Sequence, residues 1–311
     1  MRKPFPHVKL LRDFPTRLSP CVATIGNFDG LHIAHRKIVE QLVQKAKVLK
    51  LPAAIITFEP LPQTFLRPEQ SLLRLTSLRQ KVELLAEWGV ARIICLRFNA
   101  AFSRLSPQEF IENILVKRLN VKHMIVGEDF RFGFKQSGNV ALLQHEAKQF
   151  DMVVEPLAIM QTEDRKISST LIRQYLLQGD LPRVNALLGR PFSIGAHIVV
   201  GDKRGRTLGF PTANLPLKKD QTLFKGVFVT QQMIDQQKYY GVANVGTRPT
   251  VDGKHPWVEV HLLNYSGNLY GKRLKVEFLR KIRDEQRFAN VDELQQQIHR
   301  DIEAAKECIA I

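Results

Sequence analysis

Short apolar runs alternate with amphipathic stretches through the first half of this chain, from about residue 21 to residue 175. The runs predict strands at residues 22–25, 53–58, 92–96, 121–126 and 152–158. The stretches between them carry apolar residues at three- and four-residue spacing, which predicts helices at 31–49, 78–88, 107–119 and 140–149. This alternation is typical of an α/β doubly wound parallel sheet, whose ligands bind at the carboxyl ends of the strands.

The pattern changes after Asp180. A short helical piece at 181–188 is followed by segments rich in Val, Tyr and Phe and broken by Gly, Pro and Asn. These segments predict the strands of a small β-barrel at 192–200, 226–230, 239–244, 257–264 and 274–279. Asn290 is expected to cap a C-terminal helix whose Leu294, Ile298 and Ile302 pack on the barrel. With 311 residues the chain is long enough for two domains, which we expect at 1–185 and 186–311.

Charge and composition limit the possible partners. Lys plus Arg number 46 against 30 for Asp plus Glu, a net charge of +16, so anionic partners are expected. The basic residues are scattered, which favours phosphate-bearing metabolites over nucleic acid. No apolar run approaches the roughly 20 residues of a membrane helix, and the N-terminus shows no leader pattern. The three cysteines lack metal or redox spacing, and we expect a cytoplasmic protein that binds neither nucleic acid nor membrane.

Two histidines stand where the first predicted strand passes through a glycine turn into a helix. The segment contains Gly26, Phe28, Asp29, His32 and His35, and the histidines are expected on one helical face. A helix N-terminus binds anions through its N–H groups, and imidazoles beside it can donate to phosphate oxygens, so a polyphosphate fits. A structural interpretation, with Asp29 as a helix cap and solvated histidines, is equally compatible with these residues.

A cluster of hydroxyl groups falls at another predicted helix start. Ser168, Ser169 and Thr170 precede Arg173, so the cluster offers donors to a triphosphate and a cation to a leaving pyrophosphate. Helix capping by a serine hydroxyl explains part of this pattern as well.

Glycines and basic residues begin the second half. They are Gly201, Lys203, Arg204, Gly205, Arg206 and Gly209. The segment matches neither the Walker A nor the Rossmann glycine pattern, so it predicts a different phosphate cradle or a hairpin turn with solvated charges. Thr212 and Asn214 stand two apart in an extended segment, so both point to one side, and their oxygens suit Mg²⁺. Alternation with valines puts Glu259 on the polar face of its strand, as a base or as a solvated residue.

The histidine and hydroxyl clusters resemble the HxGH and ISSTxIR motifs of the nucleotidylyltransferase superfamily, which bracket an ATP site. Over residues 20–180 the chain resembles the FAD synthetase module of bacterial bifunctional riboflavin kinases/FAD synthetases. The matching segments are 57–60, 74–76 and 127–133. Ala34 stands where that module has glycine, and Leu61 where it commonly has histidine. Over residues 186–307, the string TLGFPTAN at 207–214 and the segments after it resemble riboflavin kinase.

The resemblance implies that the second half phosphorylates riboflavin to FMN with MgATP and that the first half adenylylates FMN to FAD. It implies ATP contacts in the first half for Gly26, Phe28, Asp29, His32, His35, Ser168, Ser169, Thr170 and Arg173. It implies ATP contacts in the second half for Gly201, Lys203, Arg204, Gly205, Arg206, Thr212 and Asn214, the last two also holding Mg²⁺. It implies flavin contacts for Asp129, Phe130, Arg283, Gln286, Arg287 and Phe288. Glu259 would be the base of phosphorylation, and His32, His35 and Arg173 would act in adenylyl transfer.

Two alternatives stay open at this level. The departures at Ala34 and Leu61 are compatible with a riboflavin kinase whose first domain no longer transfers adenylate. A flavin- or RNA-binding regulator on the same folds is the other alternative. A regulator, however, would need neither a base such as Glu259 nor a pair of metal ligands.

Overall fold

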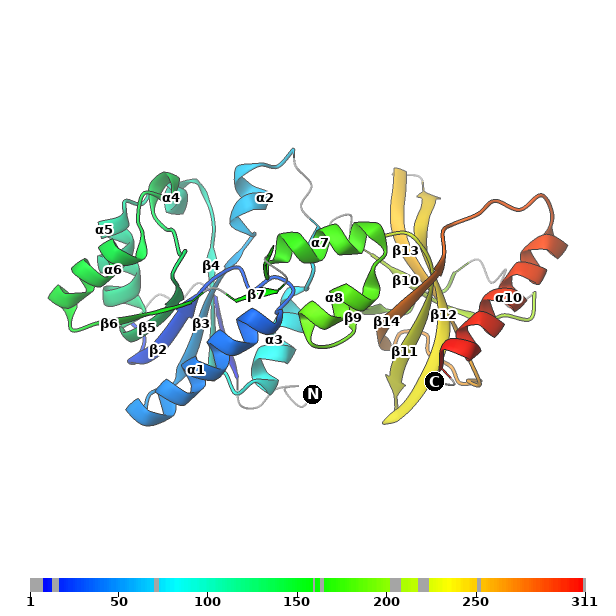
Figure 1. Cartoon of the computed structure of the whole chain (residues 1–311), viewed down its shortest axis with the longest axis horizontal. Coiled ribbons are helices and arrows are strands. Elements are labelled where there is room, and N and C mark those ends of the chain that lie inside the picture. The colour runs from blue at the N-terminus through cyan, green and yellow to red at the C-terminus, as the bar shows by residue number, and fades with distance from the viewer. Residues whose placement is uncertain are drawn as a thin grey trace. The chain divides into compact units, whose positions relative to one another are not determined.

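The computed structural model describes residues 8–12, 17–69, 73–158, 160–162, 165–201, 208–217, 224–250 and 253–309. The chain divides into two compact units, Met1–Leu72 with Thr76–Ser168, and Leu73–Leu75 with Ser169–Ile311. Each unit is described by itself (Figure 1). No helix in the described ranges is long and apolar enough to cross a membrane.

The first unit is built on a six-stranded sheet in which all neighbouring strands are parallel. In spatial order its strands are β1 (Lys9–Arg12), β4 (Arg92–Arg97), β3 (Ala53–Glu59), β2 (Cys21–Ile25), β5 (Val121–Gly127) and β6 (Val153–Leu157). The chain proceeds from β2 to β3 and β4 on one side, and then places β5 on the other side of β2. Strand order therefore reverses between β2 and β5, which is where ligands of such sheets bind.

Helices cover both faces of this sheet. Val22 and Ile55 face α1 (Ile33–Leu49) and α3 (Leu78–Glu87), whereas Ala23 and Ile56 face η1 (Phe110–Arg118) and α6 (Val140–Ala147). Figure 1 shows α1 and α6 on opposite sides of the strands. The shorter elements are α2 (Pro62–Leu66), α4 (Ala100–Ser103), α5 (Pro107–Glu109), η2 (Phe134–Gln136), η3 (Lys148–Phe150), β7 (Gln161–Thr162) and β8 (Arg165–Lys166). The predicted doubly wound α/β architecture is confirmed.

The second unit contains a curled antiparallel sheet preceded by two helices, α7 (Ser169–Gln178) and α8 (Leu181–Leu188). Its strands, in spatial order, are β10 (Thr212–Pro216), β13 (Gly253–Leu262), β12 (Gln237–Thr250), β11 (Gly226–Ile234), β14 (Arg273–Arg283) and β9 (Phe192–His197). A bridge between Val199 and Asn214, with an N–O distance of 2.9 Å, joins the two edges of the curl. Inside it, Phe224 packs on Phe228 and Phe278 with ring centroids 5.0 and 5.1 Å apart.

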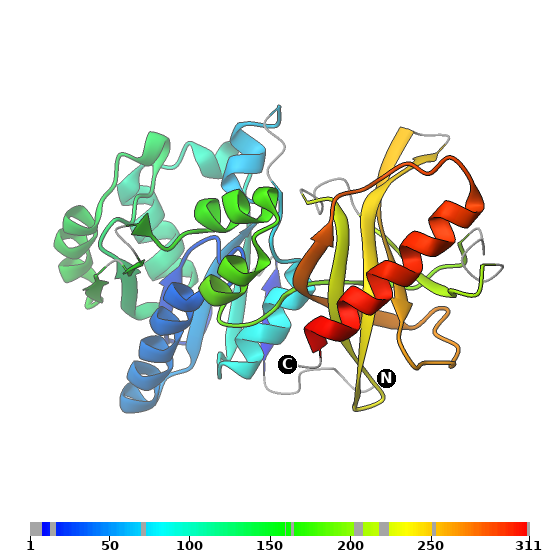
Figure 2. The ribbon, with the colours of Figure 1, turned by 45° about the vertical axis from the view of Figure 1, so that its right-hand side comes forward.

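The final helix α10 (Val291–Ile309) lies over the outer face of this sheet, as Figure 2 shows. Its Ile298 and Ile302 pack with Val227 and Val229 of β11. Asn290 Oδ1 accepts a hydrogen bond from the backbone N–H of Glu293 at 2.8 Å, as expected of a capping residue. The prediction of a barrel-like β domain closed by one helix is confirmed.

Candidate functional site

The first predicted anion site lies in the loop from β2 to α1. Phe28, Gly30 and Leu31 in this loop have positive φ angles of 45°, 84° and 49°. Left-handed backbone at a residue other than glycine costs roughly 1–3 kcal/mol, so such a loop persists only where its surroundings hold it. Phe28, Asp29 and Leu31 are buried. A Cβ at Gly26 would lie 3.3 Å from the Phe28 ring, so glycine lets this ring pack closely on the turn.

His32 precedes helix α1, which corrects the expectation that both histidines share one helical face. Its Nδ1 accepts a hydrogen bond from the backbone N–H of His35 at 3.3 Å, so His32 caps the helix and Asp29 does not. An accepting Nδ1 leaves the hydrogen of a neutral imidazole on Nε2. The two imidazoles stack with centroids 3.7 Å apart. Because His32 is only 5% exposed, the solvated interpretation fails for this residue.

Asp29 supports the loop from within. Its Oδ1 accepts a hydrogen bond from the backbone N–H of Thr76 at 3.0 Å. The Thr76 hydroxyl in turn accepts from the backbone N–H of Gly30 at 2.9 Å. These two bonds tie the β2–α1 loop to the segment before α3, so the Asp29 carboxylate helps to set the backbone around the histidines.

The two departures from the family pattern fit their places in the fold. Ala34 is the second residue of α1, where alanine favours the helix by about 1 kcal/mol relative to glycine. Leu61 is the N-cap residue of α2 and is 3% exposed, so it packs in the interior. Neither residue takes part in the ties that hold the β2–α1 loop.

The loop after β5 carries Asp129 and Phe130. Because β5 pairs in parallel with β2, the loops that follow these two strands emerge at the same edge of the sheet. Asp129 is exposed and forms an ion pair with Lys166, and Phe130 stacks on Phe132 with centroids 5.4 Å apart. Asp129 and Phe130, the flavin contacts predicted in the first half, thus share with the histidine loop the edge where strand order reverses.

The hydroxyl cluster lies at the start of α7, where the first unit ends at Ser168 and the second resumes at Ser169. Ser169 is the first residue of the helix, Ser168 precedes it, and Thr170 is exposed in the first turn. Arg173 follows one turn later and donates from Nε to the carbonyl oxygen of Leu73 at 2.7 Å. That bond orients the guanidinium group. Since Ser169, Thr170 and Arg173 belong to the second unit and the histidines to the first, each group is described by itself.

Three polar side chains form a row across the second sheet. Asn214 of β10 stands opposite Glu259 of β13, and Glu259 stands opposite Asn244 of β12. Residues paired across antiparallel strands point to the same face of a sheet. Val258 and Val260 on either side of Glu259 are fully buried, so the predicted alternation along this strand is confirmed.

The amide of Asn214 is held by its surroundings. Its Nδ2 donates to the carbonyl oxygen of Thr212 at 3.2 Å, and its Oδ1 accepts from the Trp257 indole Nε1 at 3.2 Å. Gly201 packs against it, because a Cβ at residue 201 would lie 2.6 Å from Nδ2. Asn214 is 5% exposed. The amide oxygen therefore has a defined position, as an oxygen ligand of a hard cation requires.

A pocket of about 530 Å³ lies beside Thr212 and Asn214. Its wall also includes Gly201 and the loop from Tyr265 to Tyr270. This volume falls within the roughly 300–1,000 Å³ of typical small-molecule sites. Glu259 does not line the pocket but is paired in register with Asn214, which does. The predicted base and the predicted cation ligands are thus neighbours.

Arg283, at the end of β14, forms a two-pronged ion pair with Asp301 of α10, with N–O distances of 2.8 and 2.7 Å. The side chains are 16% and 4% exposed, so the pair is largely buried. The guanidinium also lies 5.8 Å from the centre of the Phe288 ring. Gln286 and Arg287 are exposed in the loop after β14. Arg283 therefore connects this loop to α10.

Four predicted phosphate contacts, Lys203, Arg204, Gly205 and Arg206, lie outside the described residues. Among the side chains that the structure does describe, no group of three or more His, Cys, Asp or Glu could hold a metal ion. The oxygens of Thr212 and Asn214 fit Mg²⁺ as part of a shell completed by phosphate and water oxygens.

Sequence reasoning missed three supporting residues: Lys81, Trp257 and Asp301. Lysine and aspartate on predicted helices ordinarily face solvent, and a tryptophan in a strand ordinarily packs in a core. One signal could have singled out Asp301, which lies three residues after Ile298 and hence on the apolar stripe of its helix. Lys81 and Trp257 give no such signal, because their partners are distant in sequence.

Comparison with known proteins assigns both halves. The family model of FAD synthetase matches residues 14–171, and that of riboflavin kinase matches residues 188–309. The bifunctional riboflavin kinase/FMN adenylyltransferase of Escherichia coli (strain K12) is 43% identical over 288 residues, 92% of each chain. That of Haemophilus influenzae is 40% identical over 290 residues, 93% of this chain and 94% of the relative.

One solved structure is similar over nearly the whole chain. It is described as a macrolide-efflux protein from Streptococcus pneumoniae, and it matches with a TM-score of 0.83 and 31% identity over 96% of this chain and 99% of that one. Two family models, one for each half, and relatives matched over more than nine-tenths of their length lead to one assignment. The chain belongs to the family of bifunctional riboflavin kinases/FMN adenylyltransferases.

Proposed function

We propose that residues 186–311 phosphorylate riboflavin to FMN with MgATP and that residues 1–185 adenylylate FMN to FAD with release of pyrophosphate. Each half matches a family model of its own, which supports one reaction per half. The observation that carries the kinase assignment is the row of Asn214, Glu259 and Asn244 beside the pocket at Thr212.

In riboflavin phosphorylation, Glu259 is the proposed general base. Its carboxylate accepts the proton of the ribityl 5′-hydroxyl while that oxygen bonds to the γ-phosphorus of ATP and the bond to the β-phosphate oxygen breaks. Thr212 and Asn214 would hold Mg²⁺, which when bound neutralises charge on the transferring phosphate. The register row supports this division of roles, since it brings a carboxylate next to amide oxygens.

The remaining kinase contacts are proposed by position in the chain. Gly201, Lys203, Arg204, Gly205 and Arg206 would enclose the phosphates of ATP. Gln286, Arg287 and Phe288 would contact the flavin, with Arg283 holding their loop to Asp301. A glycine-rich segment with interleaved cations is suited to polyphosphate binding.

Adenylyl transfer needs little proton movement. The phosphate of FMN, with a second pKa near 6, is mostly dianionic at neutral pH, so its oxygen can bond to the α-phosphorus of ATP as pyrophosphate leaves. We assign ATP binding in this reaction to two groups of residues. They are Gly26, Phe28, Asp29, His32 and His35, together with Ser168, Ser169, Thr170 and Arg173. Asp129 and Phe130 would contact the flavin.

The alternative of a kinase with an inactive first half is not favoured. Ala34 lies in a helical turn and Leu61 in the interior, so neither residue disrupts the β2–α1 loop. We further propose a cytoplasmic enzyme. Its three cysteines form no disulfide, and Cys21 and Cys95 are buried, which is compatible with a reducing compartment.

Two single-site variants test the assignment. Glu259→Gln should abolish riboflavin phosphorylation and leave FMN adenylylation intact, because it removes only the base of the first reaction. His32→Ala should abolish FAD formation from added FMN and leave phosphorylation intact. Both activities are followed by chromatographic separation of riboflavin, FMN and FAD after incubation with ATP and Mg²⁺. Loss of both activities in either folded variant would contradict the assignment of separate sites.

A further inference from the structure

A lysine is buried beneath the histidine loop. Lys81 lies on α3 and is 3% exposed. Its ammonium group donates to the carbonyl oxygen of Asn27 at 2.6 Å and to the hydroxyl of Thr57 at 3.1 Å. The hydroxyl of Thr57 also donates to the Asn27 carbonyl oxygen, at 3.2 Å, so Lys81 and Thr57 hold the same carbonyl. A charged side chain enclosed in this way is costly to bury, so its retention calls for a role.

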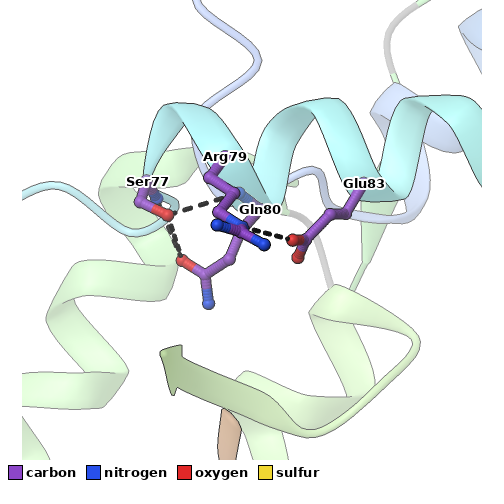
Figure 3. A network of polar contacts seen from close by, with 4 residues as sticks. All are labelled: Ser77, Arg79, Gln80 and Glu83. Atoms are coloured by element: carbon purple, nitrogen blue, oxygen red, sulfur yellow. Dashed lines mark hydrogen bonds and ion pairs between the residues drawn. The ribbon is translucent and has the colours of Figure 1, made fainter. Parts of the chain in front are cut away.

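The position of Lys81 is set by the start of α3. Figure 3 shows the first turn, where Ser77 and Gln80 cap the helix: Ser77 Oγ accepts from the Gln80 N–H at 3.3 Å, and Gln80 Oε1 accepts from the Ser77 N–H at 3.1 Å. The backbone N–H of Lys81 then donates to the Ser77 carbonyl at 2.9 Å. Arg79 pairs with Glu83 on the exposed side, which leaves Gln80 and Lys81 on the buried side.

One short segment therefore holds the loop at several points. Thr76 bonds to Asp29 and to Gly30, and Lys81, five residues later, bonds to Asn27. These anchors bracket Phe28, whose φ of 45° is unfavourable for a side-chain-bearing residue. The segment 76–81 thus keeps the loop in a conformation that it would not adopt unaided.

The Lys81 contact also sets the direction of a backbone donor. The peptide that joins Asn27 to Phe28 is trans, so its C=O and N–H groups point to opposite sides. Because the Asn27 carbonyl is directed at Lys81, the N–H of Phe28 is directed away from Lys81. Hydrogen bonding of the carbonyl by a cation polarises the peptide and strengthens that N–H as a donor.

We infer that Lys81 is a positioning residue for adenylyl transfer: its buried ammonium group holds and polarises the Asn27–Phe28 peptide so that the Phe28 N–H meets the triphosphate of ATP. The inference rests on the proposed assignment of ATP to this loop. Lys81 itself touches no reacting atom. Lys81 acts through the backbone that meets ATP. Its loss should therefore change the kinetics for ATP in adenylyl transfer and leave those for FMN unchanged.

The test compares Lys81→Met and Lys81→Gln with Lys148→Met, an exposed lysine at the start of η3. Met preserves the length of the side chain without charge, and Gln keeps a donor without charge. In Lys81→Met we expect kcat/KM for ATP in FMN adenylylation to fall about 100-fold, mostly through KM, as misplacement by about 1 Å can cost that much. The KM for FMN and the rate of riboflavin phosphorylation should not change, and Lys148→Met should match the unmodified enzyme.

A second variant covers the case in which Lys81→Met does not fold. Thr57→Val removes the hydroxyl, leaves the contact between Lys81 and Asn27, and suits a strand. It should raise KM for ATP about threefold to tenfold, the usual effect of one hydrogen bond. An equal fall in kcat/KM for ATP and for FMN would show that Lys81 only stabilises the fold. Full recovery of FMN adenylylation by Lys81→Met at a lower temperature would show the same. Either result would overturn the inference. So would unchanged ATP kinetics in either variant.

Failure of the inference is distinguishable from failure of the proposed function. If the unmodified enzyme makes no FAD from FMN, the assignment of adenylyl transfer to the first half is wrong. If it makes FAD and the Lys81 variants do so with the same KM for ATP, only the role of Lys81 is wrong.

Discussion

Gly201 packs so closely on Asn214 that the second unit leaves no room there for a side chain. A Cβ there would lie 2.6 Å from Nδ2 and 2.7 Å from Cγ of Asn214, whose amide is already bonded to Thr212 and Trp257. Gly201→Ala should therefore displace that amide and raise KM for MgATP in riboflavin phosphorylation about tenfold, the equivalent of one lost hydrogen bond. Steady-state kinetics measure this, with FMN adenylylation by the same variant as the control. A KM equal to that of the unmodified enzyme would show that the amide does not hold MgATP.

Individual side chains differ in how far the sequence can place them. The face to which Asn214 or Glu259 points within its own strand could be predicted, because alternation along one strand is a local property. Their pairing in register depends on two strands more than 40 residues apart, which local rules do not specify. Lys81 could not be anticipated, since its environment is made by Asn27 and Thr57, residues of other elements.

A largely buried ion pair joins Arg283 of β14 to Asp301 of α10. Asp301→Asn leaves the Arg283 guanidinium without its charge partner, and breaking a buried pair in this way typically costs about 3–5 kcal/mol. We expect a loss of about 3 kcal/mol in the stability of the second unit. Urea unfolding followed by Trp257 fluorescence in a Trp88→Phe background would measure it, since the chain has only two tryptophans.

The control for this variant is an exposed pair on the same helix. Lys306 and Glu303 of α10 are 58% and 65% exposed, so Glu303→Gln should change stability by less than about 0.5 kcal/mol. If Asp301→Asn were no more destabilising than Glu303→Gln, the buried pair would not hold α10 to the sheet.

A second ion-pair cluster makes the first unit sensitive to acid. A hydrogen bond from Lys45 of α1, and a weaker contribution from His123 of β5, lower the pKa of Glu155 in β6 below its ordinary value of 4.5. A lowered pKa contributes stability that is complete above pH 4.5 and is lost as the pH falls through the folded-state value. Glu155→Gln should thus melt at a lower temperature than the unmodified protein at pH 7, and this difference should shrink as the pH falls below 4.5 through the lowered pKa of Glu155.

Melting temperatures measured from pH 7 down to pH 3 test this. Glu112→Gln serves as the matched control, since Glu112 pairs with Lys117 in an exposed position on η1. A gap for Glu155→Gln that stayed constant across this range would rule out the carboxylate as the group that titrates.

Elements were predictable where their pattern is local. The buried strands β3, β4 and β5 are apolar runs, and the runs locate them well. Strand β1 was missed because its four residues, Lys9–Arg12, are mostly exposed and show no run or alternation. The predicted helix at 107–119 proved to be α5 followed by the wider π-helix η1, because three- and four-residue spacing of apolar residues does not specify the backbone hydrogen-bond pattern. Helix α1 begins at Ile33, later than predicted, because the left-handed residues Phe28 and Leu31 precede it.

The molecule as a whole joins two reactions in which the product of one is the substrate of the other. FMN made by the second half can reach the first half either by release into solution or by direct transfer. Because the two reactions are assigned to two different sets of residues, we expect release and rebinding. Released FMN must accumulate before adenylylation becomes fast, so FAD should appear after a lag when the reaction starts from riboflavin.

A mixture of Glu259→Gln and His32→Ala proteins tests this expectation, because FMN can pass between them only through solution. The mixture and the unmodified enzyme are compared at equal concentrations of active kinase sites and of active adenylyltransferase sites. Both should show the same lag in FAD and the same transient accumulation of FMN. Adding FMN at the start should abolish the lag in both, and a chain carrying both substitutions should make no FAD. If the unmodified enzyme made FAD without a lag while the mixture kept one, FMN would have to pass between the two sites of one chain.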